Sequence, residues 1–301
     1  MVWDERRNSL KGIIVKGIGG FYYIKAENGC VYECKAKGIF RKEKIIPLAG
    51  DWVKITVDSD EKGVIDEIFP RKNEWLRPPI ANLDQLVLVV SSCEPMPNLL
   101  NLDKLLTVAE YKEIEPLIVI TKVDLAEGEE LKRVYRSAGF TAMLINNLKK
   151  DTGKTLLPYL EGKVTALTGN SGVGKSSLLN NIFGTSALET SEISQKLGRG
   201  RHTTRHVELY PVNGGYVADT PGFSTIEMNK YALIKKEELA ECFREFAPYL
   251  GKCRFHDCSH TGEIGCAVKE GLEQGRISLS RYQSYCQLYE DAKLIKEWEN
   301  K

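Results

Sequence analysis

The stretch at residues 164–180, "VTALTGNSGVGKSSLLN", decides the fold of the central part of this chain. It combines an apolar strand, a glycine-rich turn and a helix that opens at Lys175, and it matches the phosphate-loop pattern GxxxxGK[ST]. Glycines in such a turn let backbone N–H groups point at phosphate oxygens, while the lysine neutralises the terminal phosphates and the serine ligates Mg²⁺. We therefore expect a nucleotide site with Mg²⁺ on Ser176. Its cradle consists of Gly169, Asn170, Ser171, Gly172, Val173, Gly174, Lys175, Ser176 and Ser177.

The stretch "IVITKVDL" at residues 118–125 indicates which base the nucleotide carries. A buried strand ends here in Thr121, Lys122, Val123 and Asp124. The carboxylate of Asp124 can accept hydrogen bonds from N1 and N2 of guanine, and the stem of Lys122 can lie along the base. On its own the tetrapeptide would fit a salt-bridged surface turn better. Beside a phosphate loop it predicts a preference for guanine over adenine.

A third strand, "GYVADTPGF" at residues 215–223, again runs into a polar turn. Asp219 is placed to hold Mg²⁺ through water, and the N–H of Gly222 to touch the terminal phosphate and so sense its presence. The segment "KLGRGRHTTRHVELY" at residues 196–210 offers Thr203 and Thr204 as a further magnesium ligand. The spacing cannot choose between these neighbours, and we prefer Thr204.

These motifs resemble those of the translation-factor-like GTPases, but their order differs. Ordinary members carry the phosphate loop first and the guanine motif last, whereas here residues 121–124 precede residues 169–176. All of the motifs sit at strand ends on one edge of a sheet, whose assembly does not depend on where the chain is cut. We therefore predict a circularly permuted α/β domain, with its old termini bridged by residues 146–163.

The segments on either side predict two further domains. From about residue 10 to 70, short alternating runs with hairpin turns predict a small antiparallel barrel of five strands, of the OB type. From about residue 231 onward the chain has a helical pattern that is interrupted by cysteines and histidines. The predicted division is a barrel domain over 1–72, the permuted nucleotide-binding domain over 73–228 and a mainly helical domain over 229–301.

The C-terminal segment "CRFHDCSHTGEIGC" has the spacing of a metal site. Three cysteines and one histidine complete a tetrahedral zinc site that has no open position, so a structural role is expected. Reduced core thiols beside a surface histidine are the simpler but less favoured alternative, and His256 is a spare ligand. The predicted zinc ligands are Cys253, Cys258, His260 and Cys266.

Charge and hydropathy limit the possible partners. The chain has 301 residues, and its 42 basic and 41 acidic side chains give a net charge of only +1. Contacts with RNA must therefore come from local clusters, such as "KAKGIFRKEK" at residues 35–44 and the basic residues of 196–206. No apolar stretch reaches about eighteen residues, and the N-terminus lacks the apolar core of a signal peptide. We expect a soluble cytoplasmic protein without a membrane partner.

Nearly the whole chain resembles one family, the circularly permuted, ribosome small-subunit-dependent GTPase A. The resemblance covers the barrel at 10–70, the permuted motifs and the cysteine–histidine segment at 253–266. It implies an OB-fold domain, a permuted GTPase domain and a zinc-binding domain. It also implies an enzyme that binds the small ribosomal subunit and its rRNA late in assembly, and hydrolyses GTP to GDP and phosphate when bound. We expect a monomer.

The chain departs from the common GTPase pattern in three places. Thr121 stands where many GTPases have asparagine, so one side-chain amide contact is missing. The usual Ser-Ala loop behind the guanine is not evident, and by position Asn146 or Asn147 replaces it. Phe223 follows Gly222 where a water-orienting glutamine often sits, so we expect slow hydrolysis by the isolated protein.

His202 is a candidate substitute for the missing glutamine, because its imidazole could orient the attacking water once a partner orders the loop. A solvated loop residue or a contact with RNA phosphate explains His202 equally well. Phe223 also leaves open a non-catalytic RNA-binding module that uses the nucleotide as a clamp. A phosphoryl-transfer kinase is a distant third possibility, because nothing in the chain resembles an acceptor site.

Overall fold

The computed structural model describes residues 8–58, 61–149, 151–185, 207–218 and 232–294. Its residues group by contact density into two compact units. The first unit comprises 1–84, 156–166 and 186–221, and the second comprises 85–155, 167–185 and 222–301. The predicted domain boundaries at residues 72 and 228 stay a prediction. Among the described residues, no helix is both long enough and apolar enough to cross a membrane.

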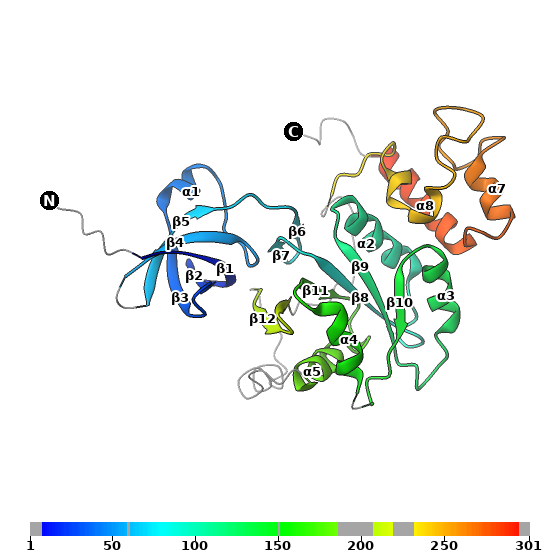
Figure 1. Ribbon diagram of the computed structural model, residues 1–301. Helices are drawn as coiled ribbons and strands as arrows, with labels where there is room; N and C mark the ends of the chain where they lie inside the picture. The colour runs from blue at the N-terminus through cyan, green and yellow to red at the C-terminus, as the bar shows by residue number, and fades with distance from the viewer. Residues whose placement is uncertain (1–7, 59–60, 150, 186–206, 219–231, 295–301) are drawn as a thin grey trace. The chain divides into compact units, whose positions relative to one another are not determined.

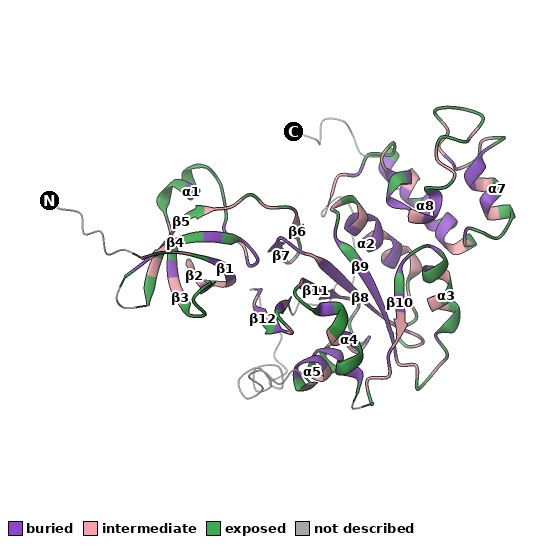
Figure 2. Cartoon of the chain, in the orientation of Figure 1, coloured by how far each residue is buried: buried purple, intermediate pink, exposed green. Residues whose placement is uncertain are grey.

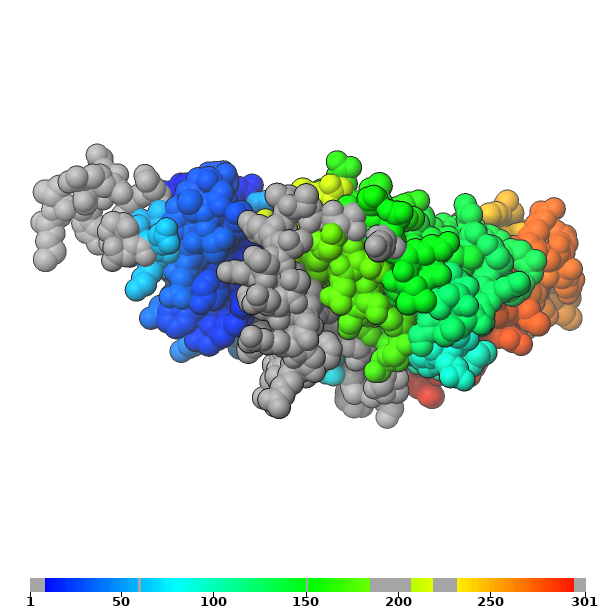
Figure 3. Space-filling model, turned by 90° about the horizontal axis from the view of Figure 1, so that it is seen from below, coloured from blue at the N-terminus to red at the C-terminus, as the bar shows by residue number. Residues whose placement is uncertain are grey.

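The N-terminal strands form a closed barrel in the order β1-β2-β3-β5-β4, as expected for the OB type. Alternate side chains of each strand point inward, and buried Ile14, Ile24, Val53, Ile55 and Ile65 fill the centre. The barrel residues form the blue part of the surface in the space-filling view (Figure 3). The strands are β1 (Asn8–Ile18), β2 (Phe21–Ala26), β3 (Val31–Ala36), β4 (Trp52–Val57) and β5 (Lys62–Ile68), with the short helix α1 (Gly38–Lys42) between β3 and β4.

One pair of barrel strands departs from the antiparallel expectation. β3 and β5 pair in parallel, with Cys34 opposite Gly63, whereas β1–β2, β2–β3, β1–β4 and β4–β5 are antiparallel. The chain passes through α1 and β4 between β3 and β5. β5 therefore runs in the same direction as β3 when it pairs with that strand. Five short strands can close into a barrel in this way without leaving an exposed edge.

The central part contains a six-stranded sheet in the order β10-β9-β8-β11-β13-β12. The pairs β8–β9, β9–β10 and β11–β13 are parallel, and β12 pairs antiparallel with β13. The strands are β8 (Gln85–Ser91), β9 (Glu115–Thr121), β10 (Thr141–Leu144), β11 (Val164–Thr168), β12 (Leu209–Val212) and β13 (Gly215–Ala218). β8, β9 and β11 are buried along almost their whole length (purple, Figure 2), which explains why they read as continuous apolar runs.

Helices connect the parallel strands, as expected for the predicted α/β domain. They are α2 (Leu99–Tyr111), α3 (Glu129–Ser137), α4 (Thr152–Leu160) and α5 (Lys175–Thr185). α2 packs on β8 and β9, and α3 packs on β10 (Figure 1). Asn98 caps the N-terminus of α2, because its side chain accepts the backbone N–H of Asn101. A short hairpin of β6 (Glu74–Leu76) and β7 (Pro79–Ala81) precedes β8.

The C-terminal part is mainly helical. It consists of the 3₁₀ turns η2 (Leu239–Cys242) and η3 (Arg244–Phe246), followed by α7 (Ala267–Glu273) and α8 (Leu279–Lys293). α8 packs against α2, which belongs to the same compact unit. Two of its tyrosines, Tyr282 and Tyr285, are buried, so α8 packs into the interior of this part.

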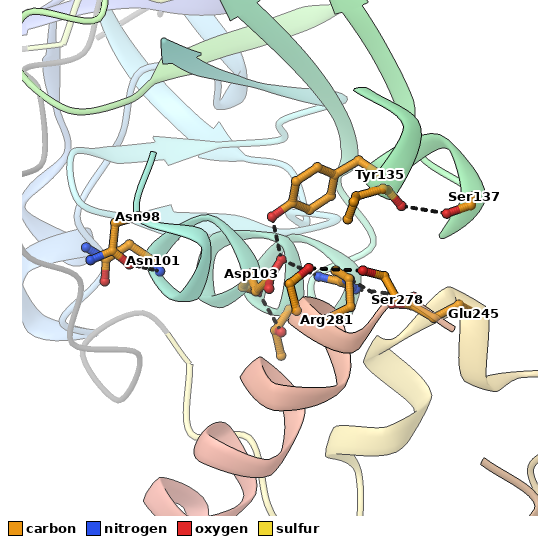
Figure 4. A network of polar contacts seen from close by, with 11 residues as sticks. Asn98, Asn101, Asp103, Tyr135, Ser137, Glu245, Ser278 and Arg281 are labelled. Carbon is orange, nitrogen blue, oxygen red and sulfur yellow. Dashed lines mark hydrogen bonds and ion pairs between the residues drawn. The ribbon is translucent and has the colours of Figure 1, made fainter. Parts of the chain in front are cut away.

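A buried ionic network fixes α8 to α2 (Figure 4). The guanidinium of Arg281 donates to Asp103 Oδ1 at 2.6 Å and to Glu245 Oε1 at 2.7 Å. The hydroxyl of Tyr135 donates to the same Asp103 Oδ1 at 2.9 Å. Burial lowers the pKa of Arg281, but the two carboxylates outweigh it and raise that pKa above its ordinary value. The arginine is therefore charged at neutral pH.

Candidate functional site

The phosphate loop lies between β11 and α5, as predicted. Gly169, Gly172 and Gly174 have φ values of +154°, +80° and +92°, which residues other than glycine rarely adopt. A Cβ at Gly169 would lie only 2.2 Å from the carbonyl oxygen of Val89. Position 169 therefore accepts only glycine, because the loop runs directly against the end of β8.

Lys175 and the first turn of α5 supply the charged part of the loop. The Nζ of Lys175 donates to the carbonyl oxygens of Gly169 and Asn170 at 2.6 and 2.8 Å, which places the ammonium group at the opening of the loop. Ser176 and Ser177 are exposed on the first turn of the helix. A helix N-terminus with a lysine and exposed hydroxyls is suited to bind a nucleotide phosphate together with a hydrated cation.

The predicted guanine corner lies directly against this loop. Thr121 ends β9 and is completely buried, and its Oγ1 donates to the carbonyl oxygen of Val173 at 2.5 Å. Lys122 has a φ of +58°, and its Nζ donates to the carbonyl oxygen of Glu94. Asp124 is exposed and makes no hydrogen bond within the described ranges. Residues 121–124 and 169–176 therefore meet although the chain reaches them in reversed order.

The loop after β10 also contacts the phosphate loop. The Nδ2 of Asn147 donates to the carbonyl oxygen of Gly174 at 3.1 Å, and the Nδ2 of Asn181 in α5 donates to the carbonyl oxygen of Asn147 at 3.0 Å. Asn146 instead accepts the N–H of Leu148 at 2.9 Å and so shapes its own loop. Of the two predicted candidates, only Asn147 touches the phosphate loop. Its role behind the guanine stays a prediction.

Several predicted residues lie outside the described residues. These are His202, Thr203, Thr204, Asp219, Gly222 and Phe223, together with the basic residues Lys196, Arg199, Arg201 and Arg205. β13, which leads toward Asp219, is described to its end at Ala218. Their predicted roles in magnesium binding, phosphate sensing, water orientation and RNA contact stay predictions.

The four predicted zinc ligands come together in one cluster. Their ligand atoms all lie within 4.8 Å of one another. The Sγ of Cys253 is 4.0 Å from the Sγ of Cys266 and 3.4 Å from the Nδ1 of His260. In a tetrahedron with Zn–S bonds of about 2.3 Å, the sulfurs stand about 3.8 Å apart, so the spacing fits one metal ion. Burial lowers the pKa of His260, which keeps its imidazole neutral and able to ligate.

Residues around the metal cluster hold its loop in place. The hydroxyl of Tyr282 donates to the carbonyl oxygen of His260 at 2.9 Å, and that of Tyr285 to the carbonyl oxygen of Ser259 at 2.7 Å. The carboxylate of Glu263 accepts the N–H of Ser259 at 2.8 Å and that of Gly262 at 3.1 Å. No sequence pattern predicts these supports, because the two tyrosines lie on α8 and contact the loop only in the folded protein.

The comparisons with known proteins agree with this architecture. Two family models match the chain: RsgA N-terminal domain over residues 11–65 and RsgA GTPase over residues 68–229. A protein of Caldanaerobacter subterraneus subsp. tengcongensis, named small ribosomal subunit biogenesis GTPase RsgA, is 46% identical over 288 residues, which are 94% of this chain and 96% of that one. A protein of the same name from Ruminiclostridium cellulolyticum is 45% identical over 296 residues, 96% of each chain.

Two solved structures extend the similarity to three dimensions. YloQ, described as a circularly permuted GTPase, has a TM-score of 0.79 and 35% identity, with 97% of this chain and 98% of that chain covered. YjeQ from Thermotoga maritima also has a TM-score of 0.79, with 33% identity and coverage of 96% and 100%. The permuted order of the motifs is therefore shared with relatives of known structure.

Proposed function

Since this chain belongs to the RsgA GTPase family, we propose that it binds the small ribosomal subunit, acts in the late maturation of that subunit and hydrolyses GTP to GDP and phosphate there. The 2.5 Å contact between Thr121 Oγ1 and the carbonyl oxygen of Val173 carries the proposal. It joins a base-reading corner to a phosphate-binding loop from which it is separated by 52 residues of sequence. A GTPase needs the base-reading corner and the phosphate loop on the same ligand. A glycine-rich turn that resembles a phosphate loop by chance would not need a base-reading corner beside it.

The residues near the nucleotide have distinct proposed roles. The backbone of residues 169–174 and the ammonium group of Lys175 hold the phosphates. Asp124 accepts the two guanine donors, with Lys122 along the base. Ser176 and Thr204 hold Mg²⁺, Asp219 holds it through water, and Gly222 reports the terminal phosphate. When bound, Mg²⁺ neutralises charge that develops on the phosphates.

Hydrolysis requires an oriented water molecule. Phe223 cannot orient it, and we assign this role to His202, which acts when the ribosomal partner is bound. In the variant His202→Ala, GTP affinity should be retained while the turnover stimulated by small subunits falls. Unchanged stimulated turnover would exclude a catalytic role for His202.

The metal cluster and the barrel serve the interaction with the small ribosomal subunit. The metal held by Cys253, Cys258, His260 and Cys266 is zinc, because three thiolates and one imidazole are a closed tetrahedral set. The barrel and the basic run at residues 35–44 contact rRNA phosphates. The protein acts as a cytoplasmic monomer.

A single-turnover assay tests the function. Phosphate release from GTP is measured with the enzyme in excess, alone and with purified small or large ribosomal subunits. We expect slow release alone, a large increase with small subunits and no increase with large ones. The variant Lys175→Ala should abolish release.

Lys154→Ala is the matched control, because this exposed lysine of α4 pairs only with neighbouring Asp151 among the described residues. It should behave like the wild type. If nucleotide-dependent binding to small subunits occurs without phosphate release above the Lys175→Ala level, the chain is an RNA-binding module that uses GTP as a clamp. Phosphate release from ATP that is as fast as phosphate release from GTP would refute the proposed base preference.

A further inference from the structure

Two side chains from different strand ends hold consecutive carbonyl groups of the phosphate loop. Thr121, at the end of β9, contacts the carbonyl oxygen of Val173 at 2.5 Å, and Asn147, after β10, contacts that of Gly174 at 3.1 Å. A Cβ at Gly174 would lie 2.8 Å from Asn147 Nδ2 and 3.8 Å from Thr121 Oγ1, so both side chains flank this one residue. They act on the same turn from two directions.

The chemistry of the two side chains is unequal. A threonine hydroxyl has one donor hydrogen, which Thr121 shares between the carbonyl oxygen of Val173 at 2.5 Å and that of Val90 at 3.1 Å. An asparagine carboxamide has two N–H donors and an acceptor oxygen. The first position of the guanine motif lacks such a group in this chain, and Asn147 brings one to the adjacent carbonyl.

The backbone around Asn147 is fixed independently of that contact. The N–H of Ile145 donates to the carbonyl oxygen of Ile120 at 2.8 Å, which extends the pairing of β10 with β9 up to the loop. Asn181 of α5 donates to the carbonyl oxygen of Asn147 at 3.0 Å, and Thr152 donates to that of Asn146 at 2.6 Å. The backbone that carries the carboxamide of Asn147 is therefore held by three hydrogen bonds that do not involve the phosphate loop.

One atom of this arrangement has no hydrogen-bond partner among the described residues. The Oδ1 of Asn147 is buried, and no donor reaches it within the described part of the chain. A buried acceptor without a donor is costly, whereas one that receives a donor from a ligand favours the bound state. This orphan oxygen is a second observation that points to a ligand at the guanine corner.

We propose that Asn147 is a positioning and specificity residue for the guanine nucleotide. Its Nδ2 holds the Gly174 peptide, its Oδ1 accepts a donor of the bound nucleotide, and together they replace the carboxamide that Thr121 does not provide. The inference rests on the proposed function, because it assumes that residues 121–124 and 169–176 bind GTP and GDP. It assigns to one residue of the loop after β10 a task that the guanine motif cannot perform alone.

Calorimetric titration of the full-length protein with GDP tests the inference. Loss of one amide hydrogen bond and of the orphan acceptor should weaken GDP binding by Asn147→Ala by about 5- to 50-fold. If the claim of replacement holds, Thr121→Asn in the same chain should restore the affinity to within about 3-fold of the wild type. Asn147→Asp, which keeps the size but removes the donor, covers the case in which the alanine variant does not fold.

Asn213→Gly is the matched control. The Nδ2 of Asn213 donates to the carbonyl oxygen of Leu157 at 3.0 Å, so the same type of bond is lost in the other compact unit. Glycine tolerates the φ of +46° at that position. Its GDP affinity should equal that of the wild type.

The outcomes distinguish a failure of the proposed function from a failure of the role given to Asn147. A wild-type protein that binds no guanine nucleotide refutes the proposed function itself. If the wild type binds GDP and Asn147→Ala or Asn147→Asp binds it equally well, the inference is wrong. Weaker binding that Thr121→Asn does not restore shows that Asn147 only supports its loop, and this also overturns the proposal.

Discussion

Replacing Arg281 by methionine should destabilise the C-terminal part strongly. The side chain of Arg281 is 1% exposed, and it lies between the carboxylates of Asp103 and Glu245, which are 0% and 3% exposed. Methionine has a similar length but no charge, so the variant leaves two buried carboxylates without a counter-ion. Breaking a buried ion pair by removal of one partner typically costs about 3–5 kcal/mol.

A triple variant separates this cost from the net value of the network. In Arg281→Met with Asp103→Leu and Glu245→Leu, none of the three charges of the network remains, but the hydroxyls of Tyr135 and Ser284 lose their hydrogen bonds to Asp103. A buried hydroxyl without a partner typically costs about 1–3 kcal/mol. Apolar replacement of a whole buried ionic group is often neutral or stabilising. The triple variant should therefore be more stable than the single variant by about 2 kcal/mol or more.

Hydrogen exchange measured by mass spectrometry is the suitable assay, because a chain with two compact units need not unfold in one step. Amides of α2 and α8 should lose protection in Arg281→Met and regain much of it in the triple variant. Amides of β1–β5 in the barrel serve as the internal control and should not change. The reasoning is refuted if the single variant loses less than about 1 kcal/mol, or if the triple variant is the less stable of the two.

Three further predictions concern other parts of the chain. Cys258→Ser should abolish stoichiometric zinc, measured by mass spectrometry of the purified protein, and reduce the exchange protection of residues 253–266; retained zinc would show that the cluster is not the site. Asp124→Asn should weaken GDP binding by about 100-fold or more and improve binding of xanthosine diphosphate, since two charge-assisted hydrogen bonds are lost; calorimetry with both nucleotides checks this. Burial raises the pKa of Asp66, but Lys37 and Thr56 outweigh it and lower that pKa below its ordinary value. The barrel should therefore lose stability as the pH falls below about 4, and Asp66→Asn should flatten this dependence in urea titrations at several pH values.

The metal cluster and the phosphate loop show what a sequence pattern can determine. Gly169, Gly172 and Gly174 predict a turn with positive φ, because local sterics favour glycine there. The apolar run before them predicts a strand, because its hydrophobic pattern is typical of a buried strand. The close spacing of Cys253, Cys258, His260 and Cys266 predicts a metal site, because three thiolates and one imidazole form the ligand set of a structural zinc ion. The order of the motifs along the chain likewise revealed the circular permutation.

The tertiary structure alone decided three features. They are the parallel β3–β5 pair, the support of the metal loop by Tyr282 and Tyr285, and the Arg281 network. Asp103 and Arg281 are 178 residues apart, and no periodicity links them. The same holds for the two carbonyl contacts of Thr121 and Asn147. Local sequence fixes which groups each strand end carries, because backbone sterics act over a few residues. Which of these groups meet depends on how the sheet and helices bury their apolar faces, and this is a property of the whole chain.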